Sequence, residues 1–136
     1  MMEIVDANIF VRSITQDDAI MAPRALAYFD TLAEEPVRAM TTEAVVAEVV
    51  FILGAKRHYG LARTRIVDEV GAILALPGLV VDHPAAVRRA LAIYGASAVD
   101  FPDALVVAHA ERIGADAIVS FDRDYDRFPS VTRREP

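Results

Sequence analysis

The chain has 136 residues, of which 54% are hydrophobic and 25% are charged, and this balance predicts one globular domain, residues 1–136, with an apolar core. Because the sequence has no cysteine, it excludes disulfides, thiolate metal sites and cysteine nucleophiles. A net charge of −6 argues against binding a polyanion through bulk electrostatics, and no apolar run reaches the roughly 18 residues that a membrane helix needs, so a cytoplasmic protein without membrane attachment is expected.

Short apolar runs alternate with longer helical patterns, which is typical of a parallel sheet covered by helices. Strands are predicted at 3–5, 37–40, 79–81 and 117–119, and helices at 9–13, 23–33, 42–56, 61–76, 84–95 and 102–114. The residues after about Val131 are expected to form a short polar tail. The predicted fold is a three-layer α/β/α sandwich with a central parallel sheet of four to five strands.

Two aspartates directly follow predicted strands. Asp6 follows the first strand and Asp122 the last, and in open parallel sheets ligands bind beyond the carboxyl ends of the strands. Each aspartate alone is commonly a turn residue. Together they favour a site at one rim of the sheet.

Glu48 lies among apolar residues of a predicted helix. Its neighbours three and four positions away are Ala44, Val45, Phe51 and Ile52, so it is expected in the middle of an apolar stripe. A carboxylate buried there must be protonated, paired or bound to a cation. The alternative is a side chain that reaches solvent or pairs with an arginine.

Asp100 and Asp103 flank the start of a further predicted helix. This arrangement also suits helix capping and the N-terminal dipole. Asp103, however, shares a helical face with Val106, Val107 and Ala110, which predicts that it turns inward toward the sheet.

Gathering Asp6, Glu48, Asp103 and Asp122 at one rim requires a cation. Each pair of carboxylates ~4 Å apart would repel by ~4 kcal/mol at an effective dielectric constant of about 20. Oxygen ligands select hard cations such as Mg²⁺ or Mn²⁺, which leave room for a substrate phosphate. The cluster therefore indicates phosphoryl chemistry, with either one or two metal ions.

The acidic net charge does not exclude a nucleic-acid substrate. If six candidate site acids (Asp6, Glu48, Asp100, Asp103, Asp122 and Asp124) are set aside, 14 of the 20 acids remain against 14 bases. Basic side chains can then bind RNA beside the site, and the candidates are Arg12, Lys56, Arg57 and Arg123. An alternative role for Lys56 and Arg57 is to complement a helix C-terminus.

Four segments, in this order, resemble the PIN domain family and, within it, the VapC-like toxins of bacterial toxin–antitoxin pairs. They are VDANIF with Asp6 and Asn8, TTEAVVAE with Glu48, DFPDALVVAHA with Asp103, and IVSFDRDY with Asp122 and Asp124. The resemblance runs from about residue 2 to 128.

The resemblance implies a Mg²⁺-dependent endoribonuclease, with Mn²⁺ able to substitute, that uses metal-activated water to leave 5′-phosphate and 3′-hydroxyl ends. Its catalytic metal ligands would be Asp6, Glu48, Asp103 and Asp122, with Asn8, Asp100, Ser120 and Asp124 in support. Asp122 is favoured over Asp124 as the late ligand, but both fit the pattern. Such toxins are usually homodimers, each neutralised by a cognate antitoxin protein.

Two other functions remain open. One is a PIN-type module that binds RNA or a protein without turnover. The other is an aspartyl-phosphate protein, although Asp6-Ala7-Asn8 lacks the second carboxylate of a D-x-D-x-T motif and the only lysine, Lys56, lies on a predicted helix. None of the three histidines, His58, His83 and His109, is expected to be catalytic, because none joins the acids by spacing.

Overall fold

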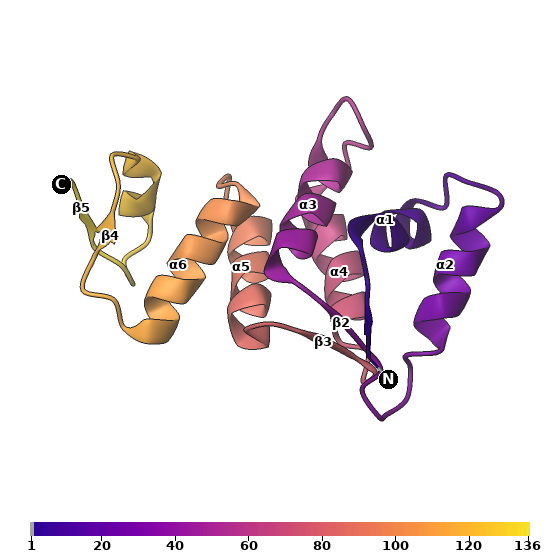
Figure 1. The fold of residues 1–136 in the computed structure, drawn as a ribbon. Coiled ribbons are helices and arrows are strands. Elements are labelled where there is room, and N and C mark those ends of the chain that lie inside the picture. The colour runs from indigo at the N-terminus through magenta and orange to yellow at the C-terminus, as the bar shows by residue number, and fades with distance from the viewer. Residues whose placement is uncertain (1) are drawn as a thin grey trace. The chain divides into compact units, whose positions relative to one another are not determined.

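The structure is a computed structural model that describes residues 2–136. The chain forms two compact units, residues 1–84 and 85–136, and each is described by itself. Figure 1 shows the order of the helices and strands along the chain. No helix within residues 2–136 has both the length and the apolar character needed to cross a lipid bilayer.

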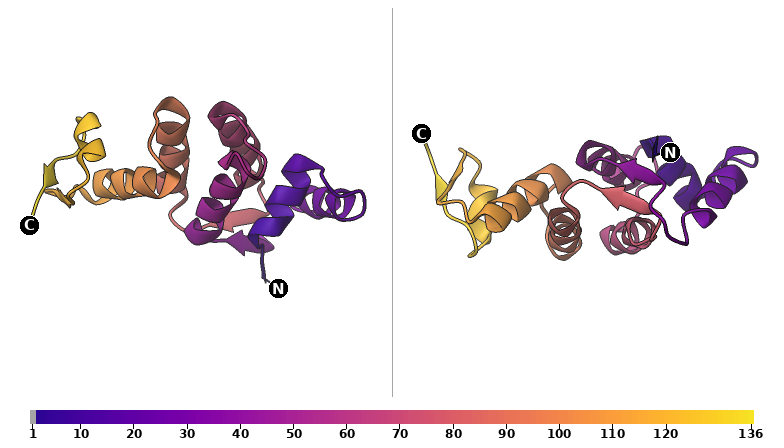
Figure 2. Two further views of the ribbon diagram at one scale, coloured as in Figure 1. Left: turned by 90° about the horizontal axis from the view of Figure 1, so that it is seen from above. Right: turned by 60° about the horizontal axis from the view of Figure 1, so that its bottom comes forward.

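The first unit contains a three-stranded parallel sheet and four helices. Its elements are β1 (Glu3–Ile4), α1 (Ala7–Thr15), α2 (Met21–Asp30), β2 (Ala39–Thr41), α3 (Glu43–Gly54), α4 (Arg63–Leu74) and β3 (Leu79–Val81). The strand order is β1-β2-β3, with Ala39 paired to both Glu3 and Leu79. Helix α1 packs on α2 and α3, and α4 packs on α3 and β3, so the helices lie around the strands (Figure 2).

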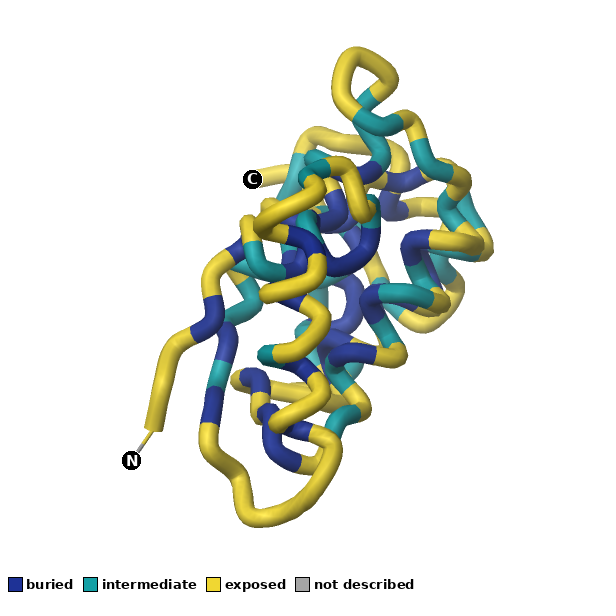
Figure 3. The backbone as a smooth tube through the Cα atoms, turned by 90° about the vertical axis from the view of Figure 1, so that its right-hand side faces the viewer, coloured by how far each residue is buried: buried dark blue, intermediate teal, exposed yellow. Residues whose placement is uncertain are grey.

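Aromatic and aliphatic side chains of the helices form the core of this unit. Phe10 of α1 is fully buried and meets Phe29 of α2 edge to face, with ring centroids 5.3 Å apart. Helix α3 begins after Thr42, whose hydroxyl accepts a hydrogen bond from the Val45 amide at 3.1 Å, as expected for an N-cap. Figure 3 shows buried and exposed positions alternating along the helices.

Gly78 sits where two backbone segments come close together, just before β3. Its amide donates to the Leu32 carbonyl at 2.8 Å, and its carbonyl accepts from the Arg38 amide at 2.9 Å. A Cβ atom at this position would lie 2.9 Å from both the Cα and the carbonyl oxygen of Leu32. Only glycine therefore fits here without a shift of the backbone.

We expect Gly78→Ala to lower the free energy of unfolding by about 1–3 kcal/mol, because the added methyl group overpacks the contact with Leu32. Thermal or urea unfolding followed by circular dichroism measures the change. The matched control is Gly71→Ala in α4, where a Cβ meets nothing within 4 Å and alanine should stabilise the helix by up to about 1 kcal/mol. Equal effects of the two substitutions would contradict this account.

The second unit contains two long helices followed by short elements. They are α5 (Pro84–Ala96), α6 (Phe101–Ile113), β4 (Ile118–Val119), the 3₁₀ helix η1 (Arg123–Arg127) and β5 (Arg133–Arg134). Helix α6 has Pro102 in its first turn and ends at Gly114, whose φ of +62° favours glycine. Strand β4 packs on α6 and pairs in parallel with β5.

The structure confirms a mixed α/β fold with parallel strands. The predicted helices are present with ends shifted by a few residues, and the strand at 79–81 has the predicted bounds. The predicted number of strands in one sheet is approximate, since three strands form one sheet and two form another. The expectation of a polar tail after Val131 is wrong, because Arg133 and Arg134 form β5.

Candidate active site

The candidate site residues are divided between the two units. The first unit contains Asp6, Asn8 and Glu48, and the second contains Asp100, Asp103, Ser120, Asp122 and Asp124. Within the second unit, the negative charges of Asp122, Asp100 and Asp124 act on Asp103 and raise its pKa.

Asp6 lies at the junction between β1 and α1, as the sequence predicts. It is exposed and occupies the N-cap position of α1, yet the described residues give its side chain no capping hydrogen bond. Asp6 therefore occupies the N-cap position without capping α1 through its carboxylate. Asn8, two residues later, lines a groove of about 720 Å³ bounded by β1, α1 and α2.

Glu48 is not in a buried stripe, which corrects the sequence interpretation. It is exposed on α3, and so are Ala44 and Phe51, the latter with 62% of its surface accessible. The buried face of α3 instead carries Val46, Val49, Val50 and Leu53. Burial therefore does not force Glu48 to bind a cation, and Glu48 is a candidate ligand only through the family pattern.

Asp103, in the first turn of α6, is half-buried and bonded to a buried tyrosine. The Tyr125 hydroxyl donates to Oδ1 of Asp103 at 3.2 Å. Burial raises the pKa of Asp103, and the negative charges of Asp122, Asp100 and Asp124 raise it further, although the bond from Tyr125 opposes this. Burial is the largest cause of a raised pKa of Tyr125, and the negative charge of Asp103 and the hydrogen bond to it add to this effect. The pKa of Tyr125 is raised to about 12, so the hydroxyl stays protonated and donates to Asp103.

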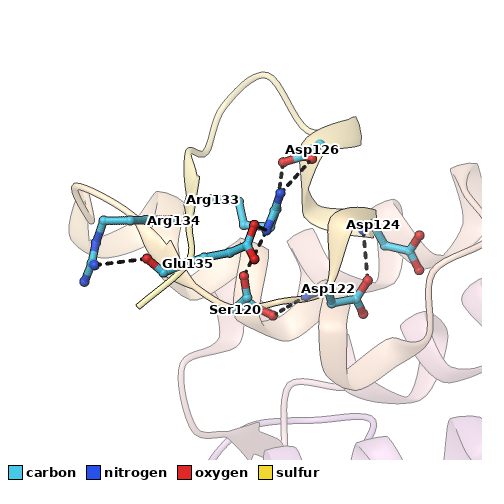
Figure 4. Close-up of polar contacts among 7 residues, drawn as sticks. All are labelled: Ser120, Asp122, Asp124, Asp126, Arg133, Arg134 and Glu135. Atoms are coloured by element: carbon cyan, nitrogen blue, oxygen red, sulfur yellow. Dashed lines mark hydrogen bonds and ion pairs between the residues drawn. The ribbon is translucent and has the colours of Figure 1, made fainter.

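Asp122 organises the turn between β4 and η1. Its amide donates to the Ser120 hydroxyl at 3.0 Å, and its own Oδ1 accepts from the Asp124 amide at 2.9 Å (Figure 4). The Asp124 carboxylate instead lies 3.5 Å from the Arg127 guanidinium. The two late aspartates, which the sequence could not separate, therefore differ in their surroundings.

The donor chemistry of these residues fits a hard divalent cation. Among residues 2–136, no three Asp, Glu or His side chains are grouped so that they could hold a metal ion. Mg²⁺, however, is commonly bound by only one or two protein carboxylates together with waters and substrate phosphate. Asp103 and Asp122 supply such carboxylates within one unit, and a cation would relieve the repulsion that raises the pKa of Asp103.

The basic residues predicted to bind RNA differ in their contacts with the rest of the protein. Lys56 and Arg57, which follow α3, are exposed, and Arg123 is exposed in η1. Arg12 is different, because its Nη1 contacts both carboxylate oxygens of Asp17 at 2.9 and 3.0 Å. Phosphate binding by Arg12 would have to compete with that ion pair.

Asp17 also accepts a hydrogen bond from Tyr59. That bond and those from Arg12 lower the pKa of Asp17 to about 2. A lowered pKa stabilises the fold at pH values above about 4, and this contribution is lost as the pH falls toward 2.

We expect Asp17→Asn to lower the free energy of unfolding at pH 7 by at most about 1 kcal/mol, since the pair is partly exposed. The difference from the wild type should shrink as the pH falls from 4 to 2. Urea unfolding at several pH values measures it. A difference that grows toward pH 2 would contradict the assignment of the lowered pKa to Asp17.

Comparison with known families decides the classification. The PIN domain model matches residues 4–131, which cover most of each unit. The chain belongs to the PIN domain family. No curated protein matches its sequence.

Two solved structures are similar to this PIN domain. VapBC2 from Rickettsia felis, bound to a DNA fragment from its promoter, has 14% sequence identity and a TM-score of 0.40, over 99% of this chain and 98% of that chain. VapC20 from Mycobacterium tuberculosis, a toxin that cleaves the sarcin–ricin loop, has 16% identity and a TM-score of 0.41, over 93% and 94%.

Sequence reasoning missed two residues that contact the candidate acids or their turn. Tyr125 resembles any aromatic residue of a short amphipathic segment, and only its hydroxyl bond to Asp103 distinguishes it. Arg133 lies in the segment expected to be a tail, yet its guanidinium bonds to the Ser120 carbonyl at 3.1 Å. Neither contact has a local sequence signal, because each joins residues more than ten positions apart.

Proposed function

We propose that this PIN domain is a Mg²⁺- or Mn²⁺-dependent endoribonuclease that acts in the cytoplasm as the toxin of a toxin–antitoxin pair. The observation that carries the proposal is the half-buried Asp103, bonded to Tyr125 and surrounded by the negative charge of Asp122 and its neighbours. The PIN match supports it, because this is a family of nucleases.

In this proposal, Asp103 and Asp122 of the second unit are metal ligands, supported by the electrostatic coupling between them. Asp6 and Glu48 are proposed as further ligands on the PIN resemblance alone. When bound, the metal supplies Lewis-acid activation of water and neutralises charge on the scissile phosphate. Tyr125 holds Oδ1 of Asp103 and leaves Oδ2 for a ligand.

The supporting residues act on the ligands and on RNA. Ser120 fixes the Asp122 amide, and Asn8, Asp100 and Asp124 are proposed to orient neighbouring groups. Lys56, Arg57 and Arg123 would bind RNA phosphates as exposed cations, with Arg12 in a lesser role. Such contacts make RNA affinity fall with rising salt.

We further propose a homodimer as the active form and a cognate antitoxin protein as its inhibitor. Both points are what the resemblance of the four acidic segments to VapC-like toxins implies. Co-purification of the chain with the product of an adjacent gene, and the mass of that complex in solution, would test both points.

Incubation of the purified chain with a pool of small RNAs tests the nuclease. We expect discrete fragments with Mg²⁺ or Mn²⁺, and none with EDTA, because the acids alone cannot activate water. Asp6→Asn, purified in parallel, should abolish cleavage and so exclude a contaminating ribonuclease. Cleavage that persists in EDTA and in the variant would overturn the proposal, and Mn²⁺ binding without cleavage would favour the binding module.

A further inference from the structure

Arg133, in the C-terminal strand β5, is bonded on several sides. Its side chain is only 12% exposed. Its Nε and Nη2 contact the two carboxylate oxygens of Asp126 at 3.0 and 3.3 Å, and its Nη1 contacts the Ser120 carbonyl at 3.1 Å and Glu135 at 3.1 Å. A two-pronged bond of this kind fixes geometry as well as charge.

The two main partners of Arg133 bracket the segment that carries the late aspartates. Ser120 precedes that segment and Asp126 lies near its end, so one guanidinium joins both sides of the turn (Figure 4). Residues between them include Asp122 and Asp124. The guanidinium therefore limits how far this turn can open.

Strand β5 also holds Ser120 through the backbone. The Ser120 amide donates to the Arg134 carbonyl at 3.0 Å, while its carbonyl accepts from Arg133 and its hydroxyl accepts from the Asp122 amide. Every polar group of Ser120 is thus engaged, and two of the three bonds come from β5. The third bond, from the Asp122 amide to the Ser120 hydroxyl, ties the position of Asp122 to that of Ser120.

The same segment contains Tyr125, which bonds to Asp103. A shift of the segment would therefore move Asp122 and the hydroxyl that orients Asp103 together. Residues that do not bind the metal but orient its ligands are also important, and replacing one of them commonly changes metal affinity by 10–100-fold.

We infer that Arg133 is a positioning residue which, by bridging Ser120 and Asp126, sets the Asp122 turn relative to Asp103. This inference rests on the proposed metal-dependent function. It assigns to the C-terminal strand a role in the chemistry of the site, in addition to its pairing with β4.

The test compares Arg133→Gln with Arg89→Gln in the full-length chain. Arg89 is a matched control, because it forms an equally close two-pronged pair with Glu111 at 2.8 and 3.1 Å but contacts no part of the 120–126 segment in its described bonds. We expect Arg133→Gln to raise the Mn²⁺ concentration for half-maximal binding about tenfold, with the KM for RNA changed less than twofold. Arg89→Gln should leave both values unchanged.

Amide chemical shifts of the metal-free chain provide a readout that does not need activity. In Arg133→Gln the Asp122 and Asp124 amide protons should move upfield as their hydrogen bonds weaken, while the Ile118 amide, which pairs with Thr132 at 2.7 Å, keeps its shift. A purely structural role would move Ile118 as well. If Arg133→Gln unfolds, Asp126→Asn is the second variant, because it weakens one side of the bridge and should give the same shift changes. In the double variant, the effects of Asp126→Asn and Arg133→Lys on the Asp122 amide shift should not add, since both act on one ion pair.

The outcomes separate the two proposals. If the wild type binds no Mn²⁺ and cleaves no RNA, the proposed function fails, and the amide shifts still test Arg133. If the wild type binds Mn²⁺ but Arg133→Gln matches Arg89→Gln in both Mn²⁺ affinity and amide shifts, the positioning role is overturned.

Discussion

Asp103→Asn is expected to lower kcat/KM for RNA cleavage by about 10³-fold, equivalent to ~4 kcal/mol of transition-state stabilisation. The substitution removes the charge that would hold the metal. It keeps an amide oxygen that can still accept the hydrogen bond from Tyr125, which lies 3.2 Å away in the wild type. The local packing should therefore survive while the chemistry is lost.

Stability should change in the opposite direction to activity. Burial and neighbouring aspartates raise the pKa of Asp103, so its ionised form destabilises the metal-free fold at neutral pH. A neutral asparagine removes that cost, and we expect the Tm of the metal-free variant to equal or exceed that of the wild type. Such a trade of stability for activity is typical of a functional site.

Steady-state cleavage measures the loss of kcat/KM, and thermal unfolding measures the Tm. Titration with Mn²⁺ measures the loss of metal affinity expected when the charge of Asp103 is removed. Asp116→Asn is the matched control, since it makes the same change of charge at an exposed aspartate of the second unit outside the group that perturbs Asp103. It should leave cleavage within twofold of the wild type. Unchanged Mn²⁺ affinity in Asp103→Asn would remove Asp103 from the set of metal ligands.

Local signals in the sequence were sufficient to predict the helices. Thr42 caps α3 through its hydroxyl, and Pro102 and Gly114 mark the two ends of α6, because each of these residues acts on its own backbone or the adjacent turn. The strand at 79–81 was also predictable, since a Pro-Gly pair ends the preceding helix.

Non-local pairing was not predictable in the same way. Strand β5 consists of two arginines, without apolar alternation, and exists because the Ile118 amide bonds to the Thr132 carbonyl across the intervening turn. The number of strands in each sheet depends on such pairings. Propensity contains little information about them.

Glu48 shows a different limit of sequence analysis. Helix α3 is apolar around most of its circumference, so more than one stripe of residues could face the core. The core takes the stripe that contains Val46 and Val50, and Glu48 is exposed. For Asp103, the predicted inward face is only partly buried, since Val107 and Ala110 are buried but Val106 is 42% exposed and Asp103 itself is half-buried.

Asp122→Asn and Asp124→Asn are expected to differ widely, although both remove one negative charge from the same turn. Asp122 is the aspartate whose charge most raises the pKa of Asp103, and its loss should lower kcat/KM about 100-fold. Its asparagine can still accept the Asp124 amide through the side-chain oxygen, as Oδ1 does at 2.9 Å, so the turn should remain. Asp124→Asn should lower kcat/KM less than threefold.

The small effect expected of Asp124→Asn follows from where its carboxylate lies. It contacts the exposed Arg127 at 3.5 Å, a surface pair worth at most about 1 kcal/mol, and only its amide is bonded to Asp122. Asparagine keeps that amide. Cleavage rates and the Mn²⁺ concentration for half-maximal binding, measured for both variants, decide whether Asp122 or Asp124 is the metal ligand. A larger loss of cleavage and Mn²⁺ affinity in Asp124→Asn would make Asp124 the ligand, and Asp122 would then only cap η1.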